Sequence, residues 1–133
     1  MSGETNISKL IQEMSPELNP GEYVFSTVPN TDDIERKDTL CELKEKEGTT
    51  VVIEKSKADH LKLPYDYVAS WITLRIHSSL EAVGLTAVFS TALAKNDLSC
   101  NVIAGYYHDH IFVDTKDSEK AMSVLTALAH KSK

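Results

Sequence analysis

Apolar residues along the N-terminal half of the chain are spaced for one short helix followed by strands. They recur at helical spacing between Ile7 and Met14, and Pro16 ends this helix because the residue before a proline avoids the α region. Gly48 separates two strand-like runs and predicts a hairpin that turns at this glycine. Alternating and β-branched runs predict three strands in this half, at residues 22–28, 39–46 and 49–54.

The C-terminal half alternates strands with helices. Ser78 and Glu81 match a capping box, and the helix that they begin is predicted to run to about Lys95. This helix carries charges only at Glu81 and Lys95, so we expect it to be covered on nearly all sides. The other predicted elements are strands at residues 71–77, 98–103 and 110–113 and a last amphipathic helix over residues 121–129.

The order of these C-terminal elements, β-α-β-β-α, is that of a ferredoxin-like unit without its last strand. Another part of the chain must supply that strand, and Glu22–Val28 is the candidate because no helix follows it in its own half. A partner subunit is the alternative source. The predicted fold class is therefore α+β, ferredoxin-like, with two interlocked halves at residues 1–64 and 65–133.

Composition excludes several functions. Twenty acidic against fourteen basic residues give a net charge of −6, so neither nucleic acid nor an anionic membrane is an expected partner. No apolar run is long enough to span a membrane, and the N-terminus lacks a signal-peptide pattern, so we expect a cytoplasmic protein. Cys41 and Cys100 are then predicted to be reduced, packed thiols.

Sequence motifs give little support to catalysis. The chain has no G-x-S-x-G, Walker A or G-x-G-x-x-G motif, so we predict that it is not an enzyme and needs no cofactor. One alternative is a metal-dependent hydrolase or isomerase that uses His77, His108 and His110. Strand alternation puts the last two on one face, and His77 is a conceivable third ligand. A solvated or hydrogen-bonded hairpin explains the same histidines without a metal.

The segment from Trp71 to Val113 resembles an ACT domain. It contains a strand, a turn of small residues with a glycine that leads into a helix, a second strand and a hairpin strand. Four runs are similar to those of small bacterial proteins with two ACT domains: Ser78–Leu85, Asn101–His110, Pro20–Phe25 and Glu45–Thr50. The resemblance implies paired ferredoxin-like domains that bind small ligands, usually amino acids, at a domain or subunit interface.

The resemblance also implies where the ligand lies. In ACT domains it lies between the turn after the first strand of one domain and the second strand of its neighbour, which correspond here to Ser78–Leu85 and Leu98–Asn101. The helix N-terminus in the first segment offers N–H donors to a carboxylate, and Gly84 leaves room for close approach. The implied ligand-binding residues are Ser78, Ser79, Glu81, Val83, Gly84, Leu85, Ser99, Cys100 and Asn101.

Each of these residues also has a purely structural interpretation. Ser78 and Glu81 can cap a helix, Gly84 can allow close packing, and Cys100 can be an inert core thiol. Asn101 is unusual in a strand, which makes a ligand or interface role more attractive there. The sequence does not identify the ligand's own side chain.

We therefore expect a non-enzymatic regulatory module. It would bind a free amino acid, form a homodimer, and change its association with a separate effector protein to the extent that the ligand's affinity differs between the two states. A purely structural dimerisation domain is the other alternative to the metal-dependent enzyme.

Overall fold

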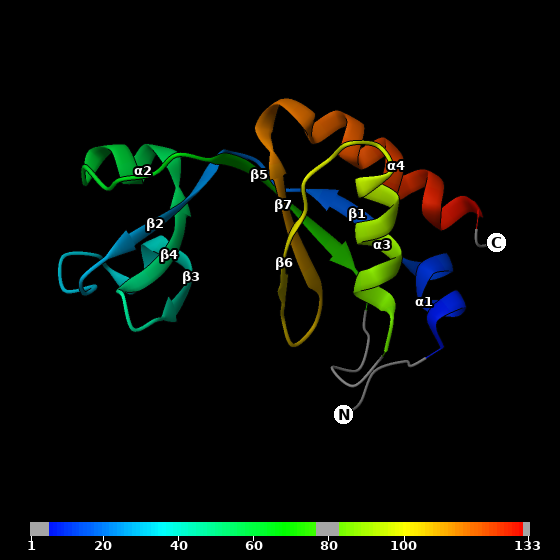
Figure 1. Ribbon diagram of the computed structural model, residues 1–133, viewed down its shortest axis with the longest axis horizontal. Coiled ribbons are helices and arrows are strands. Elements are labelled where there is room, and N and C mark those ends of the chain that lie inside the picture. Colours follow the sequence, from blue (N-terminus) through cyan, green and yellow to red (C-terminus); the bar gives the residue numbers. More distant parts are fainter. Residues whose placement is uncertain (1–5, 77–82, 132–133) are drawn as a thin grey trace. The chain divides into compact units, whose positions relative to one another are not determined.

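The computed structural model of the protein describes residues 6–76 and 83–131 (Figure 1). The chain forms two compact units. Unit 1 comprises Met1–Asn19 and Trp71–Lys133, and unit 2 comprises the intervening Pro20–Ser70. Unit 2 is therefore an insertion in the chain of unit 1. The linear halves at residues 1–64 and 65–133 remain a prediction about domains, whereas the compact units group both ends of the chain together.

Unit 1 has the connectivity of a ferredoxin-like domain. Strands β5 and β6 are joined by helix α3, and β7 lies between them in the sheet order β1-β5-β7-β6. The helices are α1 (Ile7–Glu13), α3 (Leu85–Ala94) and α4 (Ser118–Lys131). The strands are β1 (Ser15–Leu18), β5 (Val68–Arg75, in unit 1 from Trp71), β6 (Asn101–Ala104) and β7 (Asp109–Asp114), and a 3₁₀ turn, η2 (Thr115–Asp117), precedes α4.

Within unit 1 the strand that completes the sheet is β1 and not Glu22–Val28, which pairs with β5 only at Val68 and Ala69, in unit 2. β1 pairs antiparallel with β5, with Pro16 opposite Leu74. A proline cannot donate to a strand ladder and is tolerated on an edge strand, which is the position of β1 in this unit. Arg75 strengthens the pair through an ion pair with Glu17 at 3.3 Å.

Unit 2 repeats the arrangement with fewer parts. β4 lies between β2 and β3, and β2 pairs on its other side with Val68 and Ala69 of β5. The predicted hairpin is confirmed, with the Glu45 N–H donating to the Gly48 carbonyl at 2.9 Å. The elements are β2 (Tyr23–Val28), η1 (Arg36–Asp38, a 3₁₀ turn), β3 (Thr39–Lys44), β4 (Thr49–Glu54) and α2 (Lys55–His60).

Each unit has its own apolar core. In unit 2 the core lies on one face of the sheet, where Val24, Val51 and Ile53 pack with Ala58 of α2. In unit 1 it lies between the sheet and the helices α3, α4 and α1, which are grouped beside these strands in Figure 1. Fully buried members of the core of unit 1 include Ile72, Leu74, Phe89, Leu93, Ile111, Val113 and Leu125.

The predicted fold class, α+β with ferredoxin-like halves, is confirmed, but several boundaries differ, and two of these differences affect the candidate site. α3 begins at Leu85, several residues after the predicted start, and β6 begins at Asn101 rather than at Leu98. α3 is also less covered than expected. Leu85, Phe89 and Leu93 are buried, while the exposed side of the helix carries the small residues Thr86, Ala87, Thr91 and Ala94.

No helix in the described part of the chain is both long and apolar enough to cross a bilayer.

Candidate functional site

The N-terminus of α3 is built around a glycine. Gly84 is its N-cap residue and has φ +92° and ψ −7°, in the left-handed region that L side chains rarely adopt. The helix therefore begins at Leu85, later than the sequence predicts. Ser78, Ser79 and Glu81 themselves lie outside the described residues.

The surroundings of Gly84 are open. A Cβ atom built on Gly84 would meet no heavy atom within 4 Å. The preceding Val83 is 86 % exposed, whereas Leu85 is buried in the core of unit 1. Glycine has no side chain that can cap the helix, and the first N–H groups of any α-helix have no partner within the helix. This terminus therefore offers backbone donors and positive dipole charge to an anionic group that approaches Gly84.

The second predicted group of site residues follows α3. Ser99 is exposed, and Asn101 is exposed on β6 with its Nδ2 donating to the Phe112 carbonyl at 3.4 Å. Cys100 is half-buried against the core, and burial raises the pKa of its thiol to about 11. Cys100 is consequently a protonated, poorly nucleophilic thiol at neutral pH.

Unit 1 does not bring the two predicted groups together. Val83 and Gly84 precede α3 and Leu85 is its first residue, while Ser99–Asn101 follow its last turn. The helix has 10 residues, so its axis is about 15 Å long at 1.5 Å per residue. One small ligand cannot touch both groups of the same unit.

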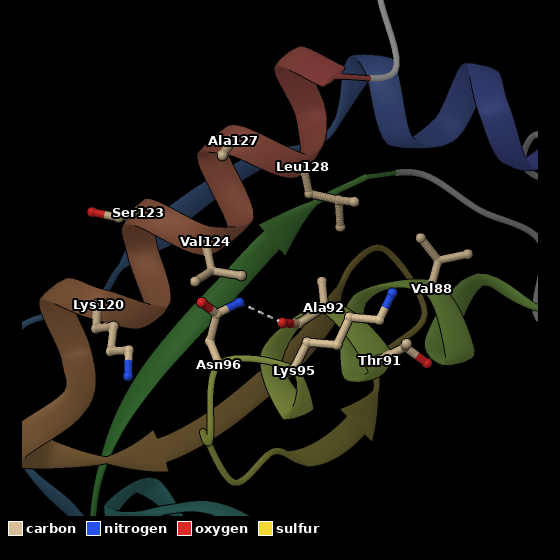
Figure 2. A pocket seen from close by; sticks show the side chains of 10 residues that line it. All are labelled: Val88, Thr91, Ala92, Lys95, Asn96, Lys120, Ser123, Val124, Ala127 and Leu128. Carbon is tan, nitrogen blue, oxygen red and sulfur yellow. Dashed lines mark hydrogen bonds between the residues drawn. The ribbon is translucent and has the colours of Figure 1, made fainter.

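A surface groove runs between α3 and α4 (Figure 2) and has a volume of about 600 Å³. Lys95 and Asn96 lie just after α3, Lys120 lies in the first turn of α4, and Asn96 donates to the Ala92 carbonyl at 2.9 Å. The lining combines two ammonium groups with small or apolar side chains: Val88, Thr91, Ala92, Ser123, Val124, Ala127 and Leu128. None of the residues predicted to bind ligand lines this groove.

The histidines of the hairpin between β6 and β7 are used as hydrogen-bond acceptors. His110 Nδ1 accepts from the indole N–H of Trp71 at 3.0 Å, and His108 Nδ1 accepts from the Ile76 backbone N–H at 3.3 Å. Both donors can only donate, so each neutral ring carries its proton on Nε2 and its single nitrogen lone pair is engaged.

This arrangement does not favour the metal-dependent alternative. Neither His108 nor His110 can coordinate a metal without giving up its hydrogen bond, because a metal ligand must supply the same lone pair. His77 lies outside the described residues. Across residues 6–76 and 83–131, no group of three or more His, Cys, Asp or Glu side chains is placed to hold a metal ion.

The turn between β6 and β7 begins at Gly105, where the sequence favours a bend. Gly105 donates its N–H to the His108 carbonyl at 2.9 Å, and the ring of His110 lies against the glycine. Tyr106 and Tyr107 at the tip form an edge-to-face pair with centroids 5.1 Å apart and remain mostly exposed. A short connection that contains a glycine between two strand-like runs is the sequence signal of such a hairpin.

The two units place the chain in the class of α+β proteins with paired ferredoxin-like domains. Residues 2–70 match an ACT domain, and residues 67–127 match a second ACT domain. The chain therefore belongs to the ACT domain family, as its resemblance implies. ACT domains are regulatory rather than catalytic domains.

Solved structures with the same fold include a Vibrio cholerae protein of unknown function, described as a possible transport protein. It is 46 % identical over 92 % of this chain and 94 % of its own, with a TM-score of 0.82. Two others match at the level of fold. Clostridium acetobutylicum aspartate kinase, described as an allosteric enzyme, is 14 % identical over 89 % of this chain and 34 % of its own, with a TM-score of 0.60.

The third is a putative C-terminal regulatory domain of aspartate kinase from Porphyromonas gingivalis. It is 13 % identical over 87 % of this chain and 96 % of its own, with a TM-score of 0.57. No curated protein gives a significant match.

Proposed function

We propose that this protein is a non-enzymatic regulatory module that binds a free amino acid at the N-terminus of α3. The observation that carries the proposal is Gly84, which holds a left-handed conformation in open space next to the first N–H groups of a helix. Those N–H groups and the helix dipole suit the carboxylate of an amino acid. The fold shared with a regulatory domain of aspartate kinase supports a role in regulation.

The ligand site is completed by a second subunit. The strand-side residues Ser99, Cys100 and Asn101 lie one helix length from Gly84 in the same unit, so a ligand that uses both groups must lie between two copies. Ser99 and Asn101 are exposed and supply polar contacts to such a ligand. A homodimer is therefore part of the proposal.

The proposal also uses three residues that lie outside the described part of the chain. Ser78 and Ser79 provide hydroxyl groups, and Glu81 provides an acceptor for the ligand's ammonium group. The ligand acts by shifting the association of the dimer with a separate effector protein in the cytoplasm. Support for that location comes from Cys41 and Cys100, which do not form a disulfide.

A thermal-shift screen against the twenty amino acids at millimolar concentration tests the proposal. A ligand present at about one hundred times its dissociation constant stabilises the folded state by about 2.7 kcal/mol, which raises Tm by several degrees. Purified protein is first checked by native mass spectrometry for a molecule that is already bound. One or a few clear responders are expected.

Variants then locate the site. Gly84→Asn keeps the left-handed backbone accessible but fills the open space, and Ser99→Leu changes the strand side. Each should weaken the response to the ligand, while Thr126→Leu, at an exposed position of α4, should leave it unchanged. Ligand-free protein that responds to no amino acid would instead support a structural dimerisation domain.

A further inference from the structure

The chain passes between its two units twice, from Asn19 to Pro20 and from Ser70 to Trp71. Within unit 1 these two crossing points are bonded to each other. The Asn19 backbone N–H donates to the Trp71 carbonyl at 2.9 Å, and the Asn19 side-chain amide donates to the same carbonyl at 3.2 Å. The amide also donates to the Thr73 hydroxyl at 2.9 Å. Asn19 thus joins the end of β1 to the middle of β5.

A histidine from the neighbouring strand holds the other side of this junction. The indole N–H of Trp71 donates to His110 Nδ1 at 3.0 Å, and the two ring centroids are 5.8 Å apart. Thr73 Oγ1 lies 3.2 Å from the same nitrogen. Trp71, Thr73 and His110 alternate with the core residues Ile72 and Ile111, so they share the sheet face that is turned away from α3 and α4.

Protonation of His110 breaks its hydrogen bond with Trp71 and lets its Nδ1 donate to Thr73 instead. Neutral His110 accepts at Nδ1 and carries its proton on Nε2. When a proton from solvent binds Nδ1, the ring becomes a donor at both nitrogens and can no longer accept from Trp71. The new N–H is within reach of Thr73 Oγ1, which has a second lone pair besides the one used by Asn19. The indole N–H is then left facing another donor.

We propose that His110 is an acid-sensitive latch within unit 1, which holds Trp71 next to Asn19 where the chain leaves and re-enters this unit. In its neutral form it holds the indole of Trp71, and therefore the crossing strands β1 and β5, in the arrangement described here. In its protonated form it releases the indole and binds Thr73 instead. The latch is a regulatory device because acid loosens the contacts of Trp71 and Asn19 within unit 1, while the apolar core on the other sheet face stays intact.

The groups near His110 either lower the pKa of its ring or form an ion pair with each other. Burial lowers the pKa of His110, and the neighbouring His108 lowers it further. On the same sheet face, Arg75 of β5 is paired with Glu17 of β1. β6 places the uncharged Ile103 opposite His110, and Asp114 lies further along the same face of β7. Asp109 precedes His110 and alternates to the opposite face.

Fluorescence can report this latch directly because Trp71 is the only tryptophan of the chain. We expect the emission of Trp71 to change in one step between pH 7.5 and 4.5, while far-UV circular dichroism stays constant. The midpoint should lie below the ordinary histidine value of about 6.5. In His110→Asn the amide oxygen can still accept from the indole, but the residue does not titrate, so the step should disappear. His60→Asn, in α2 of unit 2, should leave the step unchanged.

A second variant and a second measurement keep the test decisive if His110→Asn folds poorly. Thr73→Val removes the acceptor of the protonated state and should move the step to lower pH. Amide hydrogen exchange at Asn19, compared between wild type and His110→Asn at pH 5, should be severalfold faster in the wild type. A step that persists in His110→Asn, or one that Thr73→Val leaves in place, overturns the proposal.

Discussion

The backbone N–H of Ile76 donates to Nδ1 of His108 at 3.3 Å. Ile76 is the first residue after β5, and His108 immediately precedes the adjacent strand β7. At this end of the two strands, a histidine side chain accepts the hydrogen bond that a backbone carbonyl accepts within a sheet. Ile76 is only 5 % exposed, and a buried N–H without an acceptor costs free energy. His108 therefore anchors the chain just before it leads on towards Gly84 and α3.

This relationship predicts different outcomes for two substitutions at His108. His108→Ala leaves the Ile76 N–H without its acceptor and should lower the free energy of unfolding by about 1–3 kcal/mol. His108→Asn can place an amide oxygen near the position of Nδ1 and should lose less than half as much. Urea unfolding followed by circular dichroism measures both values. Equal losses in the two variants would show that the hydrogen bond does not carry the effect.

Gly105 is predicted to be intolerant of any side chain. A Cβ atom at this position would lie 2.8 Å from the His108 carbonyl oxygen and 3.2 Å from His110 Nε2. The first contact is with backbone, so the hairpin itself must shift. We expect Gly105→Ala to destabilise the protein by about 1–3 kcal/mol, the usual cost of overpacking. The same variant should also change the emission of Trp71, which contacts His110. Unchanged stability and emission would contradict the close packing of the turn.

Gly84 is predicted to be sensitive for a different reason. An added Cβ would meet no heavy atom of the described residues within 4 Å, so Gly84→Ala should cost only the strain of an L residue at φ +92°, about 1–2 kcal/mol. Asparagine enters this conformation more readily, and Gly84→Asn should cost less. Differential scanning calorimetry of both variants without ligand separates this strain from any effect on binding. An asparagine that costs as much as alanine would argue against strain as the cause.

The periodic elements of the fold could be read from the sequence, while the long-range pairings could not. α1, α4, β2 and β4 follow from local apolar spacing. β1 was missed because its four residues include Pro16, which signals the end of a helix, and only β5, far along the chain, gives them a partner. In the candidate site, the start of α3 was predicted too early, because a local sequence signal takes no account of the backbone conformation that Gly84 adopts.

The sequence predicts the candidate ligand-binding residues only as two separate groups. The small residues before α3 and the strand after it could be recognised, but not that one helix length separates them within a unit. Hydrogen-bond roles were also out of reach, because the acceptor state of His110 depends on Trp71, a residue on another strand. From the sequence pattern alone, His108 and His110 remain possible metal ligands. The hydrogen bonds that they accept in the structure argue against that role.

Asp109 makes stability depend on pH. Its side chain is 8 % exposed, and burial raises the pKa of its carboxyl group, with the charge of His108 opposing that shift. A raised pKa in the folded state means that folding disfavours the charged form. The protein therefore loses stability as pH rises from the unfolded-state pKa, about 3.9, through the folded-state pKa.

The variant Asp109→Asn should remove this loss. We expect it to be more stable than the wild type at pH 7 and equal to it below pH 3.9, where both side chains are uncharged. Chemical denaturation at several pH values gives the difference curve. Asp97→Asn is the matched control, because Asp97 is exposed and has φ +60°, which asparagine also adopts. A destabilised Asp109→Asn at pH 7 would mean that the carboxylate has a favourable partner.

The thiol of Cys100 should be nearly inert in the folded protein. Burial raises its pKa to about 11 from an ordinary value of 9.0. Only the thiolate attacks an alkylating agent, so this two-unit shift reduces the reactive fraction at pH 8 by about a factor of one hundred. Burial and the charge of Glu42 also raise the pKa of Cys41. A Cys41→Ser variant leaves Cys100 as the only cysteine that iodoacetamide can label. The labelling is run with and without 6 M urea and followed by mass spectrometry. It should be slow in buffer and fast in urea. Equal rates in the two solutions would show that Cys100 is exposed on the timescale of the reaction, and Cys100 would then become a stronger candidate for direct contact with a ligand.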